Sequence, residues 1–242
     1  MKICDSVALV TGANRGLGLA FVQELIAAGA RKVYAAARDP KSITLAGATS
    51  ASLDVTKQES VAVAARAFTD VNLLINNAGI CHWSGFLAPD AVETARSEME
   101  TNYFGPLLLS RAFAPILKQN GGGAIVNVLS FLSWISIPDA GTYCASKSAA
   151  WALTNWLRTG LREQGTRVIG VHPGLMDTEM VSQQMLPKVK PVAVVRQVFS
   201  AIETGRDEVL ADEMTRQVKA GLSNEPGIYL NFDPQRDLAT AA

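Results

Sequence analysis

The chain has 242 residues, 48% of them hydrophobic, and its 22 basic residues balance 22 acidic ones. This balance, with a pI of about 6.7, gives no electrostatic footprint for nucleic acid or for an anionic membrane surface. The longest uncharged apolar stretch, 121–138, is too short to span a bilayer, and the first strand-like run begins too close to Met1 to leave room for a signal peptide. We therefore expect a single domain over 1–242, with no nucleic-acid partner and no membrane partner.

Strand-like and helix-like segments alternate along the chain. Strands are expected near 7–11, 31–37, 50–53, 71–76, 124–130, 166–172 and 207–210, and helices near 17–29, 57–68, 91–119, 141–164 and 191–204. The segment 39–49 is short for a crossover helix, so we expect a loop or a single turn there. The alternation predicts an α/β fold, with one Rossmann-type, doubly wound parallel sheet flanked by helices.

A glycine-rich turn follows the first strand-like run, with the sequence Thr11-Gly12-Ala13-Asn14-Arg15-Gly16-Leu17-Gly18. Gly12 permits a tight turn, Gly16 removes the side chain where backbone must approach a pyrophosphate, and Gly18 lets helix and strand pack closely. The turn therefore predicts a dinucleotide phosphate site at a helix N-terminus. A purely structural glycine turn is the alternative.

A serine, a tyrosine and a lysine follow in the second half of the chain. Ser130 closes the expected fifth strand, at the sheet edge where open α/β folds bind ligands. Tyr143 and Lys147, at i and i+4, share one face of the next helix. We expect the lysine ammonium to lower the tyrosine pKa from its usual value of about 10, so that the phenol can exchange a proton. Alone, such a pair is common on protein surfaces.

Asn102 lies inside the long helix expected over 91–119. Pro106 has no N–H for the carbonyl four residues before it, which is that of Asn102. A kink there would leave this carbonyl free to bind water. A bend that only fits the helix to the core is the alternative.

These motifs together resemble the short-chain dehydrogenase/reductase family, over Val7 to about Leu210. The resemblance rests on Thr11-Gly12-x-x-x-Gly16-x-Gly18, Asp54, Asn76-Asn77-Ala78-Gly79, Asn102, Ser130, Tyr143-x-x-x-Lys147 and Pro173-Gly174-x-x-x-Thr178. It implies a substrate loop near 175–191, and it implies nothing for the tail from Ala211, which carries no family motif.

The resemblance also implies roles for particular residues. The implied catalytic residues are Asn102, Ser130, Tyr143 and Lys147. In the family, the residues that match Ser130 and Tyr143 act on the carbonyl oxygen. The residue that matches Lys147 binds the nicotinamide ribose, and the one that matches Asn102 holds a water of the proton relay. The implied cofactor contacts are Gly12, Asn14, Arg15, Gly16, Leu17, Gly18, Arg38, Asp54, Val55, Asn77, Ala78, Gly79, Tyr143, Lys147, Pro173, Gly174, Met176 and Thr178.

Two arginines favour NADP(H) as the cofactor. Ala37 stands where NAD-preferring enzymes place a carboxylate on the ribose hydroxyls, and Arg38 follows it. With Arg15 of the glycine turn, Arg38 could bind a 2′-phosphate by charge-assisted hydrogen bonds. Asp39 is the counter-signal, because it could pair with Arg38.

The segments 81–90, 131–139 and 175–191 are expected to surround the substrate. They bring the apolar side chains of Trp83, Phe86, Phe131, Trp134, Ile135, Met176, Met180 and Met185, which suit an apolar ketone or aldehyde, aromatic ones included. Some of these are expected in the core or at subunit contacts instead. The adjacent Cys81 and His82 point to opposite faces of a strand, so we expect no metal site, and we interpret His172 as a strand-end residue.

The expected function is an NADP-dependent carbonyl reductase or alcohol dehydrogenase. An epimerase or dehydratase on the same fold, and a silent dinucleotide sensor, are the alternatives. Apolar residues on the long helices near 91–119 and 141–164 predict a homodimer or homotetramer, unless the tail covers them. Three widely spaced cysteines suggest a reducing, cytoplasmic compartment.

Overall fold

The structure, a computed structural model, describes residues 1–181, 188–230, 232–233 and 236. Seven parallel strands form one sheet in the order β3-β2-β1-β4-β5-β6-β7. They are β1 (Val7–Thr11), β2 (Lys32–Ala37), β3 (Thr49–Ser52), β4 (Leu73–Asn76), β5 (Gly123–Val128), β6 (Thr166–His172) and β7 (Glu208–Leu210). The strand order reverses between β1 and β4, and this switch point opens a crevice at the carboxyl ends of the strands. The expected doubly wound fold is confirmed.

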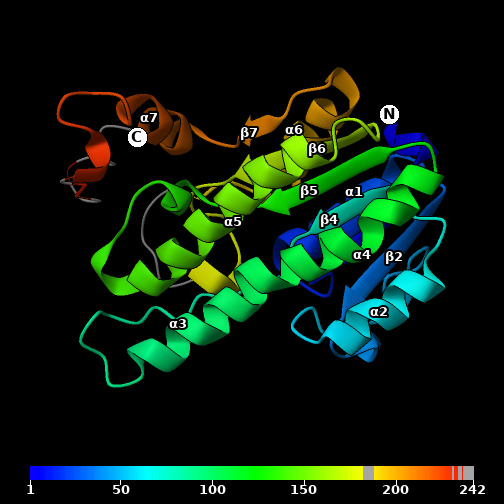
Figure 1. Cartoon of the computed structure of the whole chain (residues 1–242), viewed down its shortest axis with the longest axis horizontal. Coiled ribbons are helices and arrows are strands. Elements are labelled where there is room, and N and C mark those ends of the chain that lie inside the picture. The colour runs from blue at the N-terminus through cyan, green and yellow to red at the C-terminus, as the bar shows by residue number, and fades with distance from the viewer. Residues whose placement is uncertain (182–187, 231, 234–235, 237–242) are drawn as a thin grey trace.

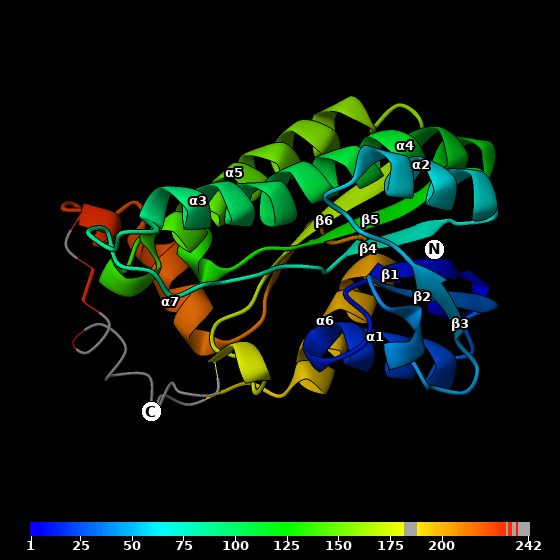
Figure 2. The ribbon, with the colours of Figure 1, turned by 90° about the horizontal axis from the view of Figure 1, so that it is seen from below.

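Helices cover both faces of the sheet (Figure 2). On one face lie α1 (Gly16–Ala27) and α6 (Pro191–Thr204), and on the other lie α2 (Gln58–Ala67), α4 (Gly105–Gln119) and α5 (Gly141–Gly160), while α3 (Ala91–Met99) runs into α4 (Figure 1). Because both faces are covered, every residue of β1 and β4 is buried, as the unbroken apolar runs in these strands require.

Each face of the sheet has its own apolar core. Successive strand residues point to opposite faces, so Val10 packs with Phe21 of α1 and Val198 of α6, whereas Leu9 packs with Phe113 of α4 on the other face. All five of these side chains are fully buried. The two cores hold the ends of β1 and β4 in place, and these ends carry the candidate site.

The helix expected over 91–119 is interrupted by a π turn. Glu100–Phe104 form this turn between α3 and α4, and the Gly105 N–H donates to the Glu100 carbonyl. Pro106 at the start of α4 has no N–H to offer, so the regular hydrogen-bond pattern cannot continue through this point. The expected kink is thus a π turn, which places Asn102 at its centre.

The other boundaries differ little from the expected ones. The segment 39–49 contains one turn of 3-10 helix, Pro40–Ser42, as expected for a connection without a crossover helix. The strand expected over 124–130 was too long: β5 ends at Val128, and Ser130 instead begins the 3-10 turn Phe131–Ser133. The expected substrate loop 175–191 is described except for 182–187, so Met185 lies outside the described residues.

The tail contains an unexpected helix, α7 (Glu213–Gly221). Asp212 caps its first turn by accepting from the Thr215 N–H at 2.9 Å. Val218 of α7 packs against Phe131 and Leu132, which follow β5, in a third, smaller core. None of the helices in the described part of the chain is long and apolar enough to cross a membrane.

We expect Phe113→Ala to lower the free energy of unfolding by about 3–5 kcal/mol, because it leaves a cavity in a well-packed core. Phe113 is fully buried between α4 and the sheet. Urea unfolding followed by circular dichroism would measure the change. The control is Val63→Ala on α2, whose side chain is largely exposed. A loss below about 1 kcal/mol in Phe113→Ala would contradict this packing.

Candidate active site

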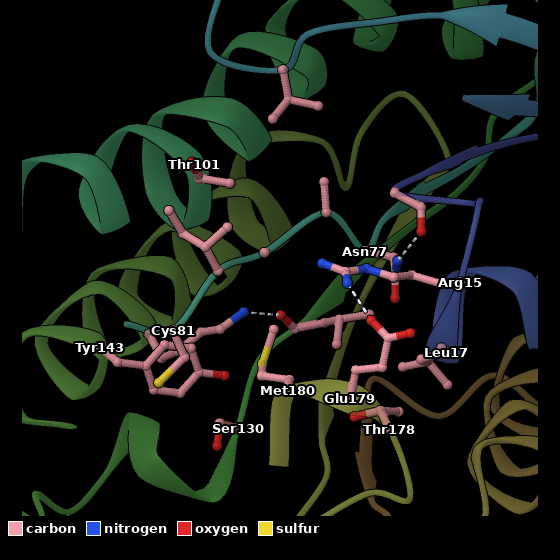
Figure 3. A pocket seen from close by; sticks show the side chains of 18 of the residues that line it. Arg15, Leu17, Asn77, Cys81, Thr101, Ser130, Tyr143, Thr178, Glu179 and Met180 are labelled. Carbon is pink, nitrogen blue, oxygen red and sulfur yellow. Dashed lines mark hydrogen bonds and ion pairs between the residues drawn. The ribbon is translucent and has the colours of Figure 1, made fainter. Parts of the chain in front are cut away.

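A cavity of about 940 Å³ lies at the carboxyl ends of the central strands. Its walls come from the β1–α1 turn, the end of β2, the segments after β3, β4, β5 and β6, the end of α3 with the following π turn, and the first turns of α5. Figure 3 shows Tyr143, Cys81 and Ser130 toward one end of this cavity and Arg15 and Leu17 toward the other. The volume is within the range of small-molecule and cofactor sites.

The β1–α1 turn forms a cradle that requires its glycines. A Cβ on Gly18 would lie 2.0 Å from the Gly12 carbonyl oxygen, a distance that no real Cβ could adopt. Gly16 has a φ of +52°, in the left-handed region that other residues avoid. No side chain caps the first N–H groups of α1, because the N-cap residue Arg15 makes no capping hydrogen bond. These N–H groups are therefore available at the place where the sequence predicts a phosphate site.

Thr11 and Asn77 join the ends of β1 and β4. The Thr11 hydroxyl accepts from the N–H groups of Asn77 (3.0 Å) and Ala78 (3.1 Å) and donates to the Ile75 carbonyl. The Asn77 side-chain amide donates to the carbonyls of Thr11 and Gly12, at 2.9 and 3.2 Å. These bonds fix the Asn77–Gly79 segment beside the glycine turn, where both segments line the cavity.

The expected serine, tyrosine and lysine meet at one end of the cavity. The Ser130 hydroxyl accepts from the Leu132 N–H at 3.1 Å and keeps its own hydrogen for another acceptor. The Lys147 ammonium donates to the Val128 carbonyl at 2.8 Å and lies 5.6 Å from the centre of the Tyr143 ring. The turn of β5 into the 3-10 segment thus brings Ser130 to the two residues of α5.

Burial dominates the proton equilibria at this end of the cavity. Burial raises the pKa of Tyr143 above its usual value of 10.0, with smaller contributions from nearby acidic groups, and a hydrogen bond with Ser130 only partly opposes the rise. The expectation that Lys147 lowers the tyrosine pKa is therefore wrong in this structure. Burial also lowers the pKa of Lys147, from 10.5 to about 8. At neutral pH the phenol carries its proton and the lysine its charge.

Asn102 lies outside the cavity wall and supports the neighbouring segment. Its side-chain amide donates to the Ile80 carbonyl (2.9 Å) and to the Ser146 hydroxyl (2.9 Å), while its oxygen accepts from the Ile80 N–H. A Cβ on Gly79 would lie 3.2 Å from the Asn102 oxygen and 3.6 Å from the Lys147 nitrogen. Asn102 and Lys147 therefore flank the same glycine.

The two arginines expected at the cofactor site both line the cavity. Arg15 forms an ion pair with Glu179, which reaches across from the segment after β6 (Figure 3). Asp39, the expected competitor for Arg38, instead accepts from the Lys41 N–H at 3.0 Å. No ion pair between Arg38 and Asp39 occurs among the described residues.

Trp83 forms the part of the cavity wall where the segments after β4 and β6 meet. Its indole N–H donates to the Met180 carbonyl at 3.0 Å, which joins the segment after β4 to the segment after β6. Trp83 has a φ of 51° and is the one non-glycine residue with positive φ in the described part of the chain. Strain of this kind concentrates at functional sites.

The cavity gathers most of the residues that the sequence predicted. All the expected cofactor residues line it except Gly18, which packs behind the turn, and of the expected catalytic residues only Asn102 lies outside it. Of the expected substrate residues, Trp83, Phe131, Met176 and Met180 line the cavity. Trp134 and Ile135 pack in the third core instead, and Phe86 is 90% exposed.

Several wall residues were not predicted as site residues. They belong to no motif, although some lie in segments expected around the substrate: Ile80, Cys81, His82, Thr101, Leu129, Leu132, Leu175 and Glu179. No group of three His, Cys, Asp or Glu side chains that could hold a metal occurs in residues 1–181, 188–230, 232–233 and 236. The glycine cradle, the uncapped N-terminus of α1 and the volume of the whole cavity fit a nicotinamide dinucleotide.

Comparison with known proteins identifies the family. The family model described as short chain dehydrogenase matches residues 6–188. A short chain dehydrogenase from Burkholderia cenocepacia J2315, solved in complex with NADP, is 42% identical, with a TM-score of 0.89 over 93% of this chain and 96% of that one.

Two curated relatives are similar over much of the chain. Dehydrogenase/reductase SDR family member 7B of Mus musculus is 34% identical over 192 residues, which are 73% of this chain and 59% of that protein. The chain thus spans less than two thirds of this relative. Galactitol 2-dehydrogenase (L-tagatose-forming) of Cereibacter sphaeroides is 38% identical over 190 residues, 74% of each chain. The chain therefore belongs to the short-chain dehydrogenase family of NAD(P)-dependent oxidoreductases.

Proposed function

We propose that the chain reduces an apolar ketone or aldehyde with NADPH, and oxidises the corresponding alcohol in the reverse direction. The observation that supports this most strongly is the meeting of Ser130, Tyr143 and Lys147 at one end of a cavity whose other end is the glycine cradle. A hydride donor and a carbonyl bound in this cavity would lie beside a proton donor.

Four side chains have separate roles in the proposed reaction at the carbonyl oxygen. A nicotinamide cofactor held in this cavity would supply the hydride for the carbonyl carbon. Ser130 donates a hydrogen bond to the oxygen with the hydrogen that its own bond from Leu132 leaves free, and Tyr143 gives up its proton as negative charge develops there. Lys147 holds its positive charge beside the tyrosine and binds the ribose. Asn102, from behind Gly79, supports the segment that faces Lys147 and takes part in reloading the proton.

The cavity wall supports an apolar substrate. It includes the apolar side chains of Trp83, Phe131, Leu132, Met176 and Met180. A polyol of the galactitol kind would need hydrogen-bond partners for several hydroxyls, which these apolar side chains do not supply. A panel of aromatic ketones, aliphatic aldehydes and the galactitol–tagatose pair, followed by NADPH absorbance, distinguishes these substrate classes.

Two other functions give different results in this assay. A silent dinucleotide sensor would bind NADPH without turning over any carbonyl. An epimerase or dehydratase would change its substrate without net oxidation of NADPH. Retention of both Tyr143 and Lys147, with the phenol protonated at neutral pH, favours the reductase.

Three features support NADP(H) over NAD(H). Arg38 lines the cavity without pairing to Asp39, Ala37 offers no carboxylate to the ribose, and the relative of Burkholderia cenocepacia was solved with NADP. Arg15 is paired with Glu179, so a 2′-phosphate would have to compete for it. Arg38 is therefore the main candidate for phosphate recognition.

Self-association and a cytoplasmic location also remain proposals. Trp156 on α5 is 64% exposed and Phe104, before α4, is 40% exposed, and the described tail packs elsewhere, against the segment after β5. These side chains support a homodimer or homotetramer built on α4 and α5. The three cysteines are unpaired, which supports a reducing compartment.

We expect Tyr143→Phe to reduce turnover by at least about a thousandfold while NADPH still binds, because only the proton donor is lost. Lys147→Ala should weaken both turnover and NADPH binding. Steady-state assays and cofactor titration by fluorescence separate the two effects. Near-normal turnover in Tyr143→Phe would rule out the assigned proton donor.

We expect Arg38→Ala to lower kcat/KM for NADPH about tenfold to hundredfold and to leave NADH nearly unchanged, because a charge-assisted hydrogen bond contributes about 1.5–3 kcal/mol. Adding Ala37→Asp should enlarge the change by repelling the phosphate. Arg31→Ala is the matched control, since Arg31 precedes the opposite end of β2. An unchanged NADPH preference in all these variants would contradict the assigned phosphate site.

We expect the reduction rate at saturating substrate to fall by about tenfold per pH unit above about pH 8. Lys147 is charged below its pKa of about 8 and loses this charge as the pH rises through it. In Lys147→Arg the charge persists, so the alkaline fall should move to higher pH. Rates measured from pH 6 to 10 test this, and a flat wild-type profile to pH 10 would contradict it.

A further inference from the structure

A buried histidine contacts the candidate catalytic serine from outside the cavity. His172 is the last residue of β6 and is 1% exposed. Its Nδ1 atom lies 3.0 Å from the Ser130 carbonyl oxygen. Because a carbonyl oxygen can only accept, Nδ1 must carry the ring proton in this contact.

Three side chains, Trp134, Glu208 and Lys219, surround this imidazole ring on its other sides. Trp134 stacks on it, with ring centres 4.1 Å apart and an interplanar angle of 21°. The ammonium of Lys219, on α7, lies 4.9 Å from the Trp134 ring centre and binds both carboxylate oxygens of Glu208 at 2.6 Å. Glu208, on β7, lies 3.6 Å from the His172 Nε2 atom.

Burial keeps the His172 ring neutral although it lies beside an ion pair. Burial lowers the pKa of His172 to about 4, so Nε2 carries no proton at neutral pH. The Nε2 atom lies 3.6 Å from the Glu208 carboxylate, beyond hydrogen-bond distance, and the Lys219 ammonium pairs with that carboxylate. Within the described part of the chain, the ring makes its hydrogen bond to Ser130.

A second contact ties the same part of the tail to the cavity. The Asp212 carboxylate accepts from the Gly174 N–H at 2.6 Å while it caps α7, and the Ala211 N–H donates to the His172 carbonyl at 3.1 Å. Residues 208–219 thus brace both the segment after β5 and the segment after β6. Neither His172 nor Lys219 lines the cavity.

We propose that His172 is a positioning residue for Ser130, held in its orientation by Trp134, Glu208 and Lys219. This inference rests on the proposed function, in which the Ser130 hydroxyl binds the substrate oxygen. The Nδ1–H bond adds to the Ser133 N–H bond (3.0 Å) in holding the Ser130 carbonyl, and Ser130 leaves β5 in an extended conformation with a φ of −163°. Without the Nδ1–H bond this carbonyl keeps only the bond of its own turn, and we expect the hydroxyl to shift relative to Tyr143.

The test compares His172→Asn with His172→Gln. Asparagine carries its amide nitrogen near the Nδ1 position, whereas glutamine carries its own near the Nε2 position. We expect kcat to fall about tenfold in His172→Gln and to stay within about threefold of wild type in His172→Asn, because small displacements of a positioned group cost large factors in rate. The dissociation constant for NADPH should change in neither variant. Equal losses in both variants, or no loss in either, would overturn the proposal.

Two further measurements separate this idea from folding defects and from the proposed function. The chain has only two histidines, so proton NMR with His82→Gln as the reference can assign the slowly exchanging Nδ1–H signal of His172, whether or not a substrate is known.

Lys219→Met, which keeps the contact with Trp134, should lower kcat about threefold and broaden that signal. Arg196→Met, which breaks the ion pair of Arg196 with Glu24, is the control and should change neither. An Nδ1–H that exchanges at the rate of a solvent-exposed imidazole, or an unchanged Lys219→Met, would refute the positioning role even if Tyr143→Phe behaves as expected.

Discussion

The hydroxyl of Thr11 makes the contact on which the cavity depends. In a doubly wound sheet, the segments that follow the two central strands diverge at the switch point. The backbone groups exposed there need hydrogen-bond partners. Thr11 satisfies the N–H groups of Asn77 and Ala78, and Asn77 satisfies the carbonyls of Thr11 and Gly12 in return. These bonds hold β1 and β4 together where their following segments diverge. The glycine cradle on one side and the Gly79 segment on the other take their positions from this joint.

The end of the cavity that holds Ser130, Tyr143 and Lys147 is assembled by features of three different kinds. A π turn places Asn102 behind Gly79, the 3-10 turn after β5 presents Ser130, and helical spacing presents Tyr143 and Lys147. Each is a local consequence of the sequence: Pro106 prevents a regular α-helix, Ser130 caps a new turn, and four residues complete one turn of α5. The sheet brings these local features together at one edge.

Local patterns could be predicted from the sequence, and effects of burial could not. The glycine turn and the tyrosine–lysine pair were found because their spacing is short and their geometry is set by one turn of backbone. The Tyr143 pKa was mispredicted because its main cause is burial among elements distant in sequence. Glu179, His172 and Asp212 were missed as partners for the same reason: the residues that they contact lie 164, 42 and 38 positions away.

The bracing of Ser130 by residues 208–219 also bears on the order in which the protein is made. The glycine cradle and β1 are synthesised first, and the strands that flank the cavity follow as the chain emerges. Glu208, Asp212 and Lys219 emerge long afterwards, yet they hold the segments that carry Ser130 and Gly174. The glycine turn is therefore synthesised well before the residues that brace Ser130 and Gly174. On the proposed function, a chain that stopped short of Glu208 would keep this turn but lose the bracing of Ser130.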